Sequence, residues 1–165
     1  MATPTNYQLI IGYSDSQCTN ISQISYQQGT HIFNAPCPPD APPCIPSLPG
    51  IYVKNTCSSS DISENINSLF PSNTQYVFVD QFSDTNCQDK VSTSAITFGY
   101  CSPNPLGFSA QFSTNATGVI GSVYTPMGEC IGSPAADIVV DGGCKTLAGA
   151  VSFKIAVKSA GLRRR

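Results

Sequence analysis

The sequence has no tryptophan, a single histidine and few charged residues, which make up 11% of its 165 residues. No Cys-x-x-Cys pair occurs, so a structural zinc site is not expected around His31. His31 also has no nucleophile elbow near it, and no phosphate-binding glycine loop occurs. The acidic pairs Asp80 with Asp84 and Asp137 with Asp141 lie in segments typical of turns. We therefore expect no enzyme, and predict no catalytic residue, metal ligand or cofactor.

Long apolar runs are also missing from the sequence. No run approaches the length of a transmembrane helix, so we expect no membrane span. No nucleic-acid partner is expected either. Uncharged polar residues are abundant instead, and this composition is typical of secreted β proteins and of surfaces that contact other surfaces.

The cysteines are even in number, and this predicts disulfides and an oxidising compartment. The eight residues are Cys18, Cys37, Cys44, Cys57, Cys87, Cys101, Cys130 and Cys144. Pairing inside each hairpin needs no long-range contact, so we predict Cys18–Cys37, Cys44–Cys57, Cys87–Cys101 and Cys130–Cys144.

One sequence pattern recurs along the chain. Residues 7–18 (YQLIIGYSDSQC) and 76–87 (YVFVDQFSDTNC) share an opening Tyr, a Ser-Asp pair and a closing Cys. Residues 118–130 (GVIGSVYTPMGEC) resemble a third copy with one extra residue. In the first two copies, Asp15 and Asp84 are expected to accept a hydrogen bond from their own backbone two residues on. Self-similarity of this kind predicts a fold built from repeats.

The predicted fold is therefore one all-β domain, residues 1–165, stapled by disulfides. It consists of three pseudo-repeats, each a three-stranded antiparallel meander, at about 7–57, 76–114 and 118–158. The units are expected to pack as a sandwich or around a pseudo-threefold axis. The threefold count also resembles β-trefoil and β-prism lectins, although the recurring Gln-x-Trp of the trefoil is missing. Three aromatic residues should occupy equivalent places, namely Tyr13, Phe82 and Tyr124.

Two segments interrupt the repeats. Residues 38–49 (PPDAPPCIPSLP) are rich in proline, which fixes φ and lacks the amide donor, so we predict an extended surface loop. Residues 58–72 form a linker in which Ser60 or Asp61 is expected to cap a short helix that Pro71 ends. Its apolar side would carry Ile62, Ile66 and Leu69.

Two N-glycosylation sequons begin at Asn20 and Asn115, both where the repeat predicts exposed turns. Together with the cysteines they predict a secreted or cell-surface protein. Residues 1–6 have no basic region and residues 9–11 are a short apolar run, so a secreted form is expected to have lost its leader.

Charge is divided unevenly between the body and the C-terminal end. Before Lys154 there are three basic and ten acidic residues, a net charge of −7, and from Lys154 on there are five basic and no acidic ones. The predicted assembly residues are Lys154, Lys158, Arg163, Arg164 and Arg165. The first and last strands, 7–11 and 150–157, are expected to be sheet edges that pair between copies. Contacts of this head-to-tail kind give filaments.

The resulting hypothesis is a non-enzymatic extracellular structural protein, a self-assembling subunit of a surface layer, coat or filament. Its partners would be other copies of itself. The alternative is a carbohydrate-binding, lectin-like module whose partners are glycans. A second alternative is a secreted inhibitor or toxin-like protein.

Overall fold

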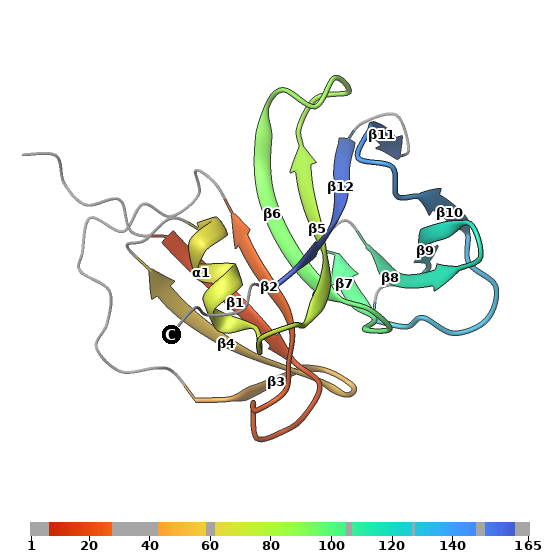
Figure 1. Ribbon diagram of the computed structural model, residues 1–165. Coiled ribbons are helices and arrows are strands. Elements are labelled where there is room, and N and C mark those ends of the chain that lie inside the picture. The colour runs from red at the N-terminus through yellow and green to blue at the C-terminus, as the bar shows by residue number, and fades with distance from the viewer. Residues whose placement is uncertain are drawn as a thin grey trace, which may run out of the picture.

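The described part of the chain forms two antiparallel β-sheets and one short helix, which confirms the predicted all-β class (Figure 1). The computed structural model describes residues 7–27, 43–58, 62–104, 107–126, 128–147 and 151–160. The larger sheet contains β1 (Tyr7–Tyr13), β2 (Ile21–Gln27), β3 (Ile45–Leu48), β4 (Ile51–Ser58), β5 (Gln75–Phe82), β6 (Lys90–Thr97), β11 (Cys144–Leu147) and β12 (Val151–Ser159). The smaller sheet contains β7 (Ser102–Asn104), β8 (Phe108–Asn115), β9 (Gly118–Tyr124) and β10 (Ala136–Val139). The strand orders are β11-β12-β5-β6-β2-β1-β4-β3 and β10-β9-β8-β7.

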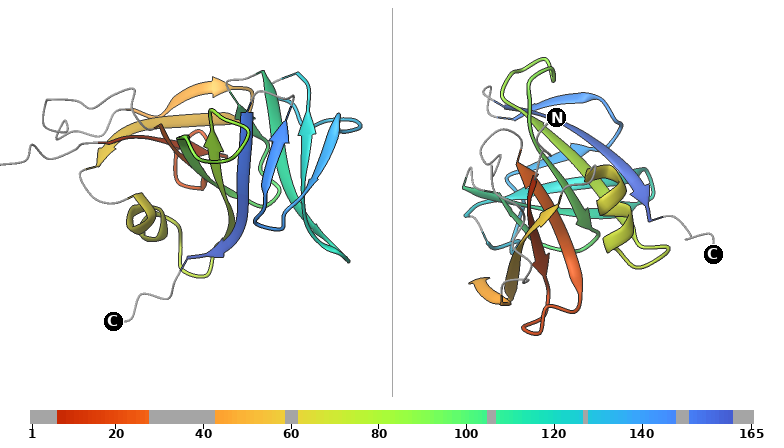
Figure 2. Two further views of the ribbon diagram at one scale, coloured as in Figure 1. Left: turned by 90° about the horizontal axis from the view of Figure 1, so that it is seen from above. Right: turned by 90° about the vertical axis from the view of Figure 1, so that its left-hand side faces the viewer.

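Alternation along the strands places a buried apolar cluster on each face of the larger sheet. Leu9 on β1 belongs to a buried cluster that includes Ile66 of helix α1 (Ile62–Leu69). Val77 on β5 belongs to the opposite face and packs in a cluster with Phe112 of the smaller sheet. The helix and the smaller sheet therefore cover opposite faces of the larger sheet (Figure 2).

The short helix predicted within residues 58–72 is confirmed as α1. Ile66 is 1% exposed, and Leu69 packs against the same buried cluster. The Phe70 ring, directly after the helix, stacks on Tyr76 at a centroid distance of 5.0 Å. Contact with the sheet therefore stabilises a helix that is too short to be stable alone.

The β1–β2 and β5–β6 hairpins have the same local geometry. The strand register shifts at Tyr13 in the first hairpin and at Phe82 in the second. Cys18 and Cys87 follow in the turns, with φ of 53° and 56°. β4 pairs with the free side of β1, and β12 pairs with the free side of β5. Counted inward from either edge, each half of the larger sheet therefore has an edge strand, then β4 or β12, and then the β1–β2 or β5–β6 hairpin. Tyr124 ends β9 in the smaller sheet, so it does not occupy the place held by Tyr13 and Phe82.

The sheets do not follow the boundaries of the three predicted units. The unit at 7–57 contains β1 to β4, all in the larger sheet, whereas the unit at 76–114 contributes to both sheets. The reason is that the chain leaves the larger sheet after β6, builds the smaller sheet, and returns only at β11.

The predicted pairing of the cysteines is wrong. Three observed bonds exclude all four predicted pairs: Cys18–Cys44, Cys87–Cys144 and Cys101–Cys130. Cys57 is also disulfide-bonded, and Cys37 lies outside the described residues. Cys87 and Cys101 lie on either side of β6, whose eight residues span about 26 Å. A disulfide needs Cα atoms within about 7 Å, so partners at opposite ends of a strand cannot bond.

The predicted sheet edges are also wrong. β1 lies between β2 and β4, and β12 lies between β5 and β11. The backbone groups of the first and last strands are therefore satisfied within the chain, because β4 and β11 return beside them. The edges of the larger sheet are β3 and β11, and those of the smaller sheet are β10 and β7.

Part of the proline-rich stretch 38–49 is a strand rather than a loop. Residues 45–48 form β3, which pairs only with β4, and an edge strand of this kind tolerates Pro46. Residues 38–42 lie outside the described part of the chain. Among the described residues, no helix has the length and apolar character needed to cross a bilayer.

Candidate functional site

A cavity of about 420 Å³ lies between the two sheets. Its floor is the face of the larger sheet that points away from α1, with side chains from β1, β2, β5 and β6. Its roof comes from β7, β8 and β9 of the smaller sheet and from Tyr100, which lies between β6 and β7. Ile10 lines the cavity and is 42% exposed, so solvent reaches the cavity beside β1.

Strand register gives the cavity floor a polar centre and apolar flanks. Ser25 on β2 lies opposite Ser94 on β6. The same row continues to Ile10 on β1 and to Val79 on β5. Gln23 lies on the same face of β2, two residues before Ser25, because alternate residues of a strand share a face. The floor therefore offers hydroxyl and amide groups at its centre with hydrocarbon on both sides.

A chain of hydrogen bonds connects the roof to the floor. The Ser102 hydroxyl on β7 donates to the Gln23 side-chain oxygen at 3.0 Å. The Gln23 amide nitrogen donates to Ser25 Oγ at 2.7 Å. Ser25 Oγ and Ser94 Oγ are 3.0 Å apart and share a further hydrogen bond. These bonds fix the orientation of the polar groups before any ligand enters.

Aromatic and aliphatic side chains form the rest of the lining. Phe108 and Phe112 come from β8, Ile138 from β10 and Ile155 from β12. Gly121 on β9 gives the Phe112 ring its room, because a Cβ at this position would lie 2.7 Å from Phe112 Cε1. The apolar part of the cavity therefore depends on a glycine directly behind an aromatic ring.

The phenol of Tyr100 is held between the sheets. Its hydroxyl is buried and has no hydrogen-bond partner among the described residues. Burial raises the pKa of Tyr100 to about 12. The approach is close, since a Cβ on Gly12 would lie 3.2 Å from Tyr100 Oη. Tyr100 is therefore neutral at physiological pH.

No charged side chain is among the described residues that line this cavity. Its titratable groups are the phenols of Tyr26 and Tyr100. Within the described ranges, no group of three or more His, Cys, Asp and Glu side chains is placed to hold a metal ion. The chemistry that the lining offers is hydrogen bonding by neutral groups and contact with hydrocarbon.

The lysines predicted as assembly residues lie on the opposite face of the larger sheet. Lys154 Nζ lies 5.6 Å from the centre of the Phe82 ring, and Lys158 Nζ lies 4.1 Å from that of Phe78. The remaining predicted assembly residues, Arg163, Arg164 and Arg165, lie outside the described part of the chain. The two described lysines are thus occupied by cation–π contacts within the chain.

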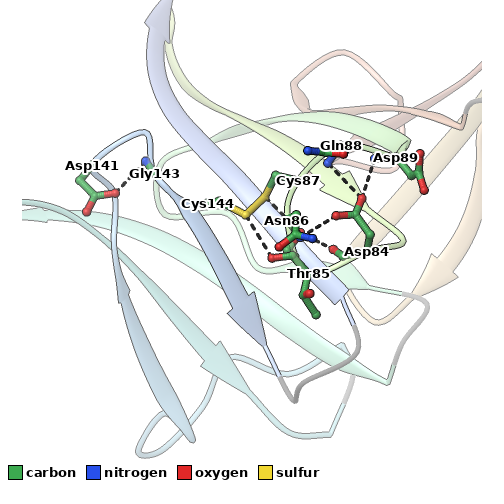
Figure 3. Close-up of a disulfide and its surroundings, with 10 residues drawn as sticks. Asp84, Thr85, Asn86, Cys87, Gln88, Asp89, Asp141, Gly143 and Cys144 are labelled. Carbon is green, nitrogen blue, oxygen red and sulfur yellow. Dashed lines mark hydrogen bonds between the residues drawn. A yellow bond between two sulfur atoms is a disulfide. The ribbon is translucent and has the colours of Figure 1, made fainter.

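The turn of the β5–β6 hairpin is built around a carboxylate (Figure 3). The backbone amides of Asn86, Gln88 and Asp89 donate to the Asp84 carboxylate. These bonds, that from Asp89 first, hold the pKa of Asp84 below its ordinary value. The predicted hydrogen bond from the backbone two residues on is confirmed. Because these amides are bonded to Asp84, the turn keeps a conformation in which the backbone of Cys87 is left-handed.

The Cys87–Cys144 disulfide joins this turn to the outer strand β11 (Figure 3). Ser152 Oγ lies 3.1 Å from Cys87 Sγ and donates to the Asp84 carbonyl oxygen at 2.6 Å. Ser152 is fully buried on β12, so the turn is attached to two further strands.

The β1–β2 turn has the same construction around Asp15. Its carboxylate accepts hydrogen bonds from the backbone amides of Gln17, Thr19 and Asn20, and from the Thr19 hydroxyl. The Asn20 amide is the first cause of a lowered pKa of Asp15. Cys18 joins this turn to Cys44, directly before β3. Both turns therefore stabilise the fold and leave their carboxylates occupied.

Both sequon asparagines are exposed. Asn20 lies between the Asp15 turn and β2, and Asn115 ends β8. The Asn115 side-chain oxygen accepts hydrogen bonds from the backbone amide and the hydroxyl of Thr117, at 2.8 and 2.7 Å. Glycosylation at these two positions stays a prediction.

Sequence reasoning missed the cavity. The signal was a set of polar residues on one face of the two strands: Gln23 and Ser25 on β2 (ISQISYQ), and Ser92 and Ser94 on β6 (KVSTSAIT). A polar face of this kind is normally interpreted as a solvent face. Here the smaller sheet covers part of that face.

Comparison with protein-family models, with curated proteins and with solved structures gives no match to this chain. The cavity is therefore the feature of the molecule from which a function can be inferred.

Proposed function

We propose that this protein binds a small, uncharged and largely apolar molecule in the cavity between its sheets. The observation that carries the proposal is the lining, a space of about 420 Å³ bounded by hydrocarbon and by neutral hydroxyl and amide groups. Sites for small molecules typically have this size, with a few placed polar groups in an apolar surface.

The absence of charge from the described lining decides the class of ligand. A carboxylate or ammonium group that entered the cavity would lose its hydration without meeting an opposite charge. A neutral molecule loses less on entering, and it gains from contact with Phe108, Phe112 and Ile155. The proposal is binding alone, because phenols are the only titratable groups that the described lining supplies.

The test uses prodan, a neutral naphthyl ketone whose fluorescence shifts to the blue in an apolar site. Prodan is titrated into the wild-type protein and into Ala110→Phe, which places a ring in the cavity from β8. Ser113→Phe is the matched control, because it places the same ring on the same strand, but Ser113 is exposed on the opposite face of β8 and does not line the cavity.

We expect saturable binding to the wild-type protein and to Ser113→Phe, with marked weakening in Ala110→Phe. Circular dichroism checks that each variant is folded. Absence of saturable binding to the wild-type protein would contradict the proposal, and so would equal binding by Ala110→Phe.

Carbohydrate binding, the alternative predicted from the sequence, would use the same hydroxyl and amide groups. The apolar walls favour a ligand with more hydrocarbon than a sugar carries. Competition separates the two: displacement of prodan by octane supports the apolar ligand, whereas displacement by cellobiose alone supports a glycan.

Self-assembly as a structural subunit is a second proposal, favoured by exposed apolar residues on two edge strands. Ile45 on β3 is 45% exposed and Val139 on β10 is 62% exposed. Contacts between copies would run through these edges rather than through β1 and β12. Sedimentation velocity over a concentration series tests this, with Val139→Lys expected to weaken association. A monomer at every concentration would contradict it.

An extracellular location accords with the disulfides, which are typical of proteins from oxidising compartments. Secretion itself remains a proposal. Expression with and without export, followed by thiol counting, would test it.

A further inference from the structure

We infer that the ligand presents an uncharged acceptor oxygen, such as that of a ketone, ester or ether, to the Ser25–Ser94 pair in the cavity floor. This inference rests on the proposed function and adds the chemical group that the site recognises. It follows from the number of protons in the hydrogen-bond chain that crosses the cavity.

The two serine hydroxyls carry two protons between them. Their mutual bond at 3.0 Å uses one of these protons, whichever oxygen donates. Ser25 Oγ also accepts a proton from the Gln23 amide, at 2.7 Å. The Gln23 oxygen is in turn used by Ser102, which donates to it at 3.0 Å. The second hydroxyl proton of the pair therefore has no acceptor within this chain of bonds.

The position of the pair makes this proton available to a ligand. Ser25 and Ser94 are direct cross-strand partners on β2 and β6, the two central strands of the floor, and both are only partly buried. Their row continues into Val79 and Ile10, so the donor has hydrocarbon on both sides. A ligand that fills the apolar space lies against this donor. An acceptor oxygen at that point satisfies it, and a plain hydrocarbon leaves it without a partner.

A third serine in the floor provides an internal comparison. Ser92 on β6 also lines the cavity, but its hydroxyl donates to the Gln81 side-chain oxygen at 3.4 Å. Its proton is thus already engaged. If recognition by the serine pair depends on its spare proton, replacing Ser92 should leave the selectivity unchanged, whereas replacing Ser25 and Ser94 should reduce it.

The experiment compares two variants of the same shape. Ser25→Ala with Ser94→Val removes both hydroxyls, and Ser25→Ala with Ser94→Thr keeps one. Both side chains introduced on β6 are β-branched, which suits a strand. Methyl hexyl ketone, octane and octanoate are measured as competitors of prodan on each variant, on the wild-type protein and on Ser92→Ala.

We expect the ketone to lose roughly two- to tenfold in affinity in the variant without hydroxyls, the range for one net hydrogen bond. The threonine variant and Ser92→Ala should bind the ketone as the wild-type protein does. Octane should lose no affinity in any variant, because it makes no hydrogen bond to the serine pair, and octanoate should be the weakest competitor throughout.

A ketone affinity that does not distinguish the valine from the threonine variant overturns the inference, even when prodan binds normally and the cavity function stands. An equal loss in Ser92→Ala also overturns it, because that hydroxyl has no spare proton. If these double variants do not fold, the smaller double variant Ser25→Ala with Ser94→Ala is compared with Ser25→Ala alone, which keeps the Ser94 hydroxyl proton. An equal heat of ketone binding for both again refutes the inference, and a less favourable heat for the variant without hydroxyls supports it.

Discussion

The Cys87–Cys144 disulfide joins the β5–β6 turn to β11, and its contribution to stability can be tested by removing it. In Cys87→Ala with Cys144→Ala the chain loses a bond that closes a loop of 57 residues. In the chain-entropy treatment, a loop of that length corresponds to about 4 kcal/mol of the free energy of unfolding. The equivalent bond at the other turn, Cys18–Cys44, closes 26 residues, for which the same treatment gives about 3.5 kcal/mol.

The two bonds should nevertheless stabilise almost equally, because a third disulfide lies inside the longer loop. Cys101–Cys130 shortens the path from Cys87 to Cys144 even in the unfolded chain. Fourteen residues remain on each side of it, so the effective loop has about 28 residues and a value of about 3.5 kcal/mol. Removing Cys101–Cys130 first should raise the cost of losing Cys87–Cys144 by about 0.6 kcal/mol.

The assay is equilibrium unfolding in urea with both midpoint and slope fitted, since cross-links change the expanded state as well. Non-reducing peptide mapping of the wild-type protein provides the control on pairing. A loss below about 1 kcal/mol would refute the reasoning, and so would a mapped peptide that joins Cys87 to Cys101 or to Cys130.

Three further predictions follow from the packing and the turns. Hydrogen bonds from backbone amides lower the pKa of Asp15 and Asp84 below 3.8 in the folded protein. The stabilisation that the two ionised carboxylates give to the fold is therefore complete above pH 3.8 and is lost as the pH falls through their lower folded-state pKa values. Asp15→Asn with Asp84→Asn should flatten this acid loss of Tm, and an unchanged acid profile would contradict it. Phe82→Ala should cost about 3–5 kcal/mol because Phe82 is 6% exposed, and an unchanged Tm would refute its role in the core. Gly121→Ala should cost about 1–3 kcal/mol by calorimetry, and less in a Phe112→Leu background, whereas equal costs in both would exclude the clash with the ring.

The elements that local sequence determines were predictable. Residues 7–13 alternate as a half-buried strand should, and they form β1. The helix was predicted from its apolar spacing, although contact with the sheet stabilises it. The two aspartate turns were also predicted, and their physical cause lies within one segment of the chain, because the bonded groups are a few residues apart.

The strand order and the cysteine pairs depend on contacts between distant segments. Nothing near Cys87 in the sequence indicates that its partner is 57 residues away on an outer strand. The choice of nearest neighbours along the sequence therefore gave the wrong pairs. It also gave the wrong edges, because β4 and β11 return to cover strands that lie near the two ends of the sequence.

The cavity was not predictable for a related reason. Gln23, Ser25 and Ser94 form the polar side of amphipathic strands, and nothing local distinguishes a solvent face from the floor of a site. The difference comes from Ser102 and Tyr100, which enter from the connection between β6 and the smaller sheet. The site exists only where that connection folds back on the larger sheet.

Comparison of the two halves of the larger sheet separates stability from function. Each half has an aspartate turn, and a cysteine of that turn forms a disulfide with a cysteine at or directly before the edge strand. Each half also has a lysine over an aromatic ring. Lys54 Nζ lies 5.7 Å from the centre of the Tyr13 ring, and Lys154 Nζ lies 5.6 Å from that of Phe82. These shared contacts all hold strands together. In the second half the connection from β6 to β11 contains the whole smaller sheet, and with it the roof of the cavity. Features present in both halves therefore explain why the sheet is stable, and the smaller sheet within the second half explains why a cavity lies on one face of it.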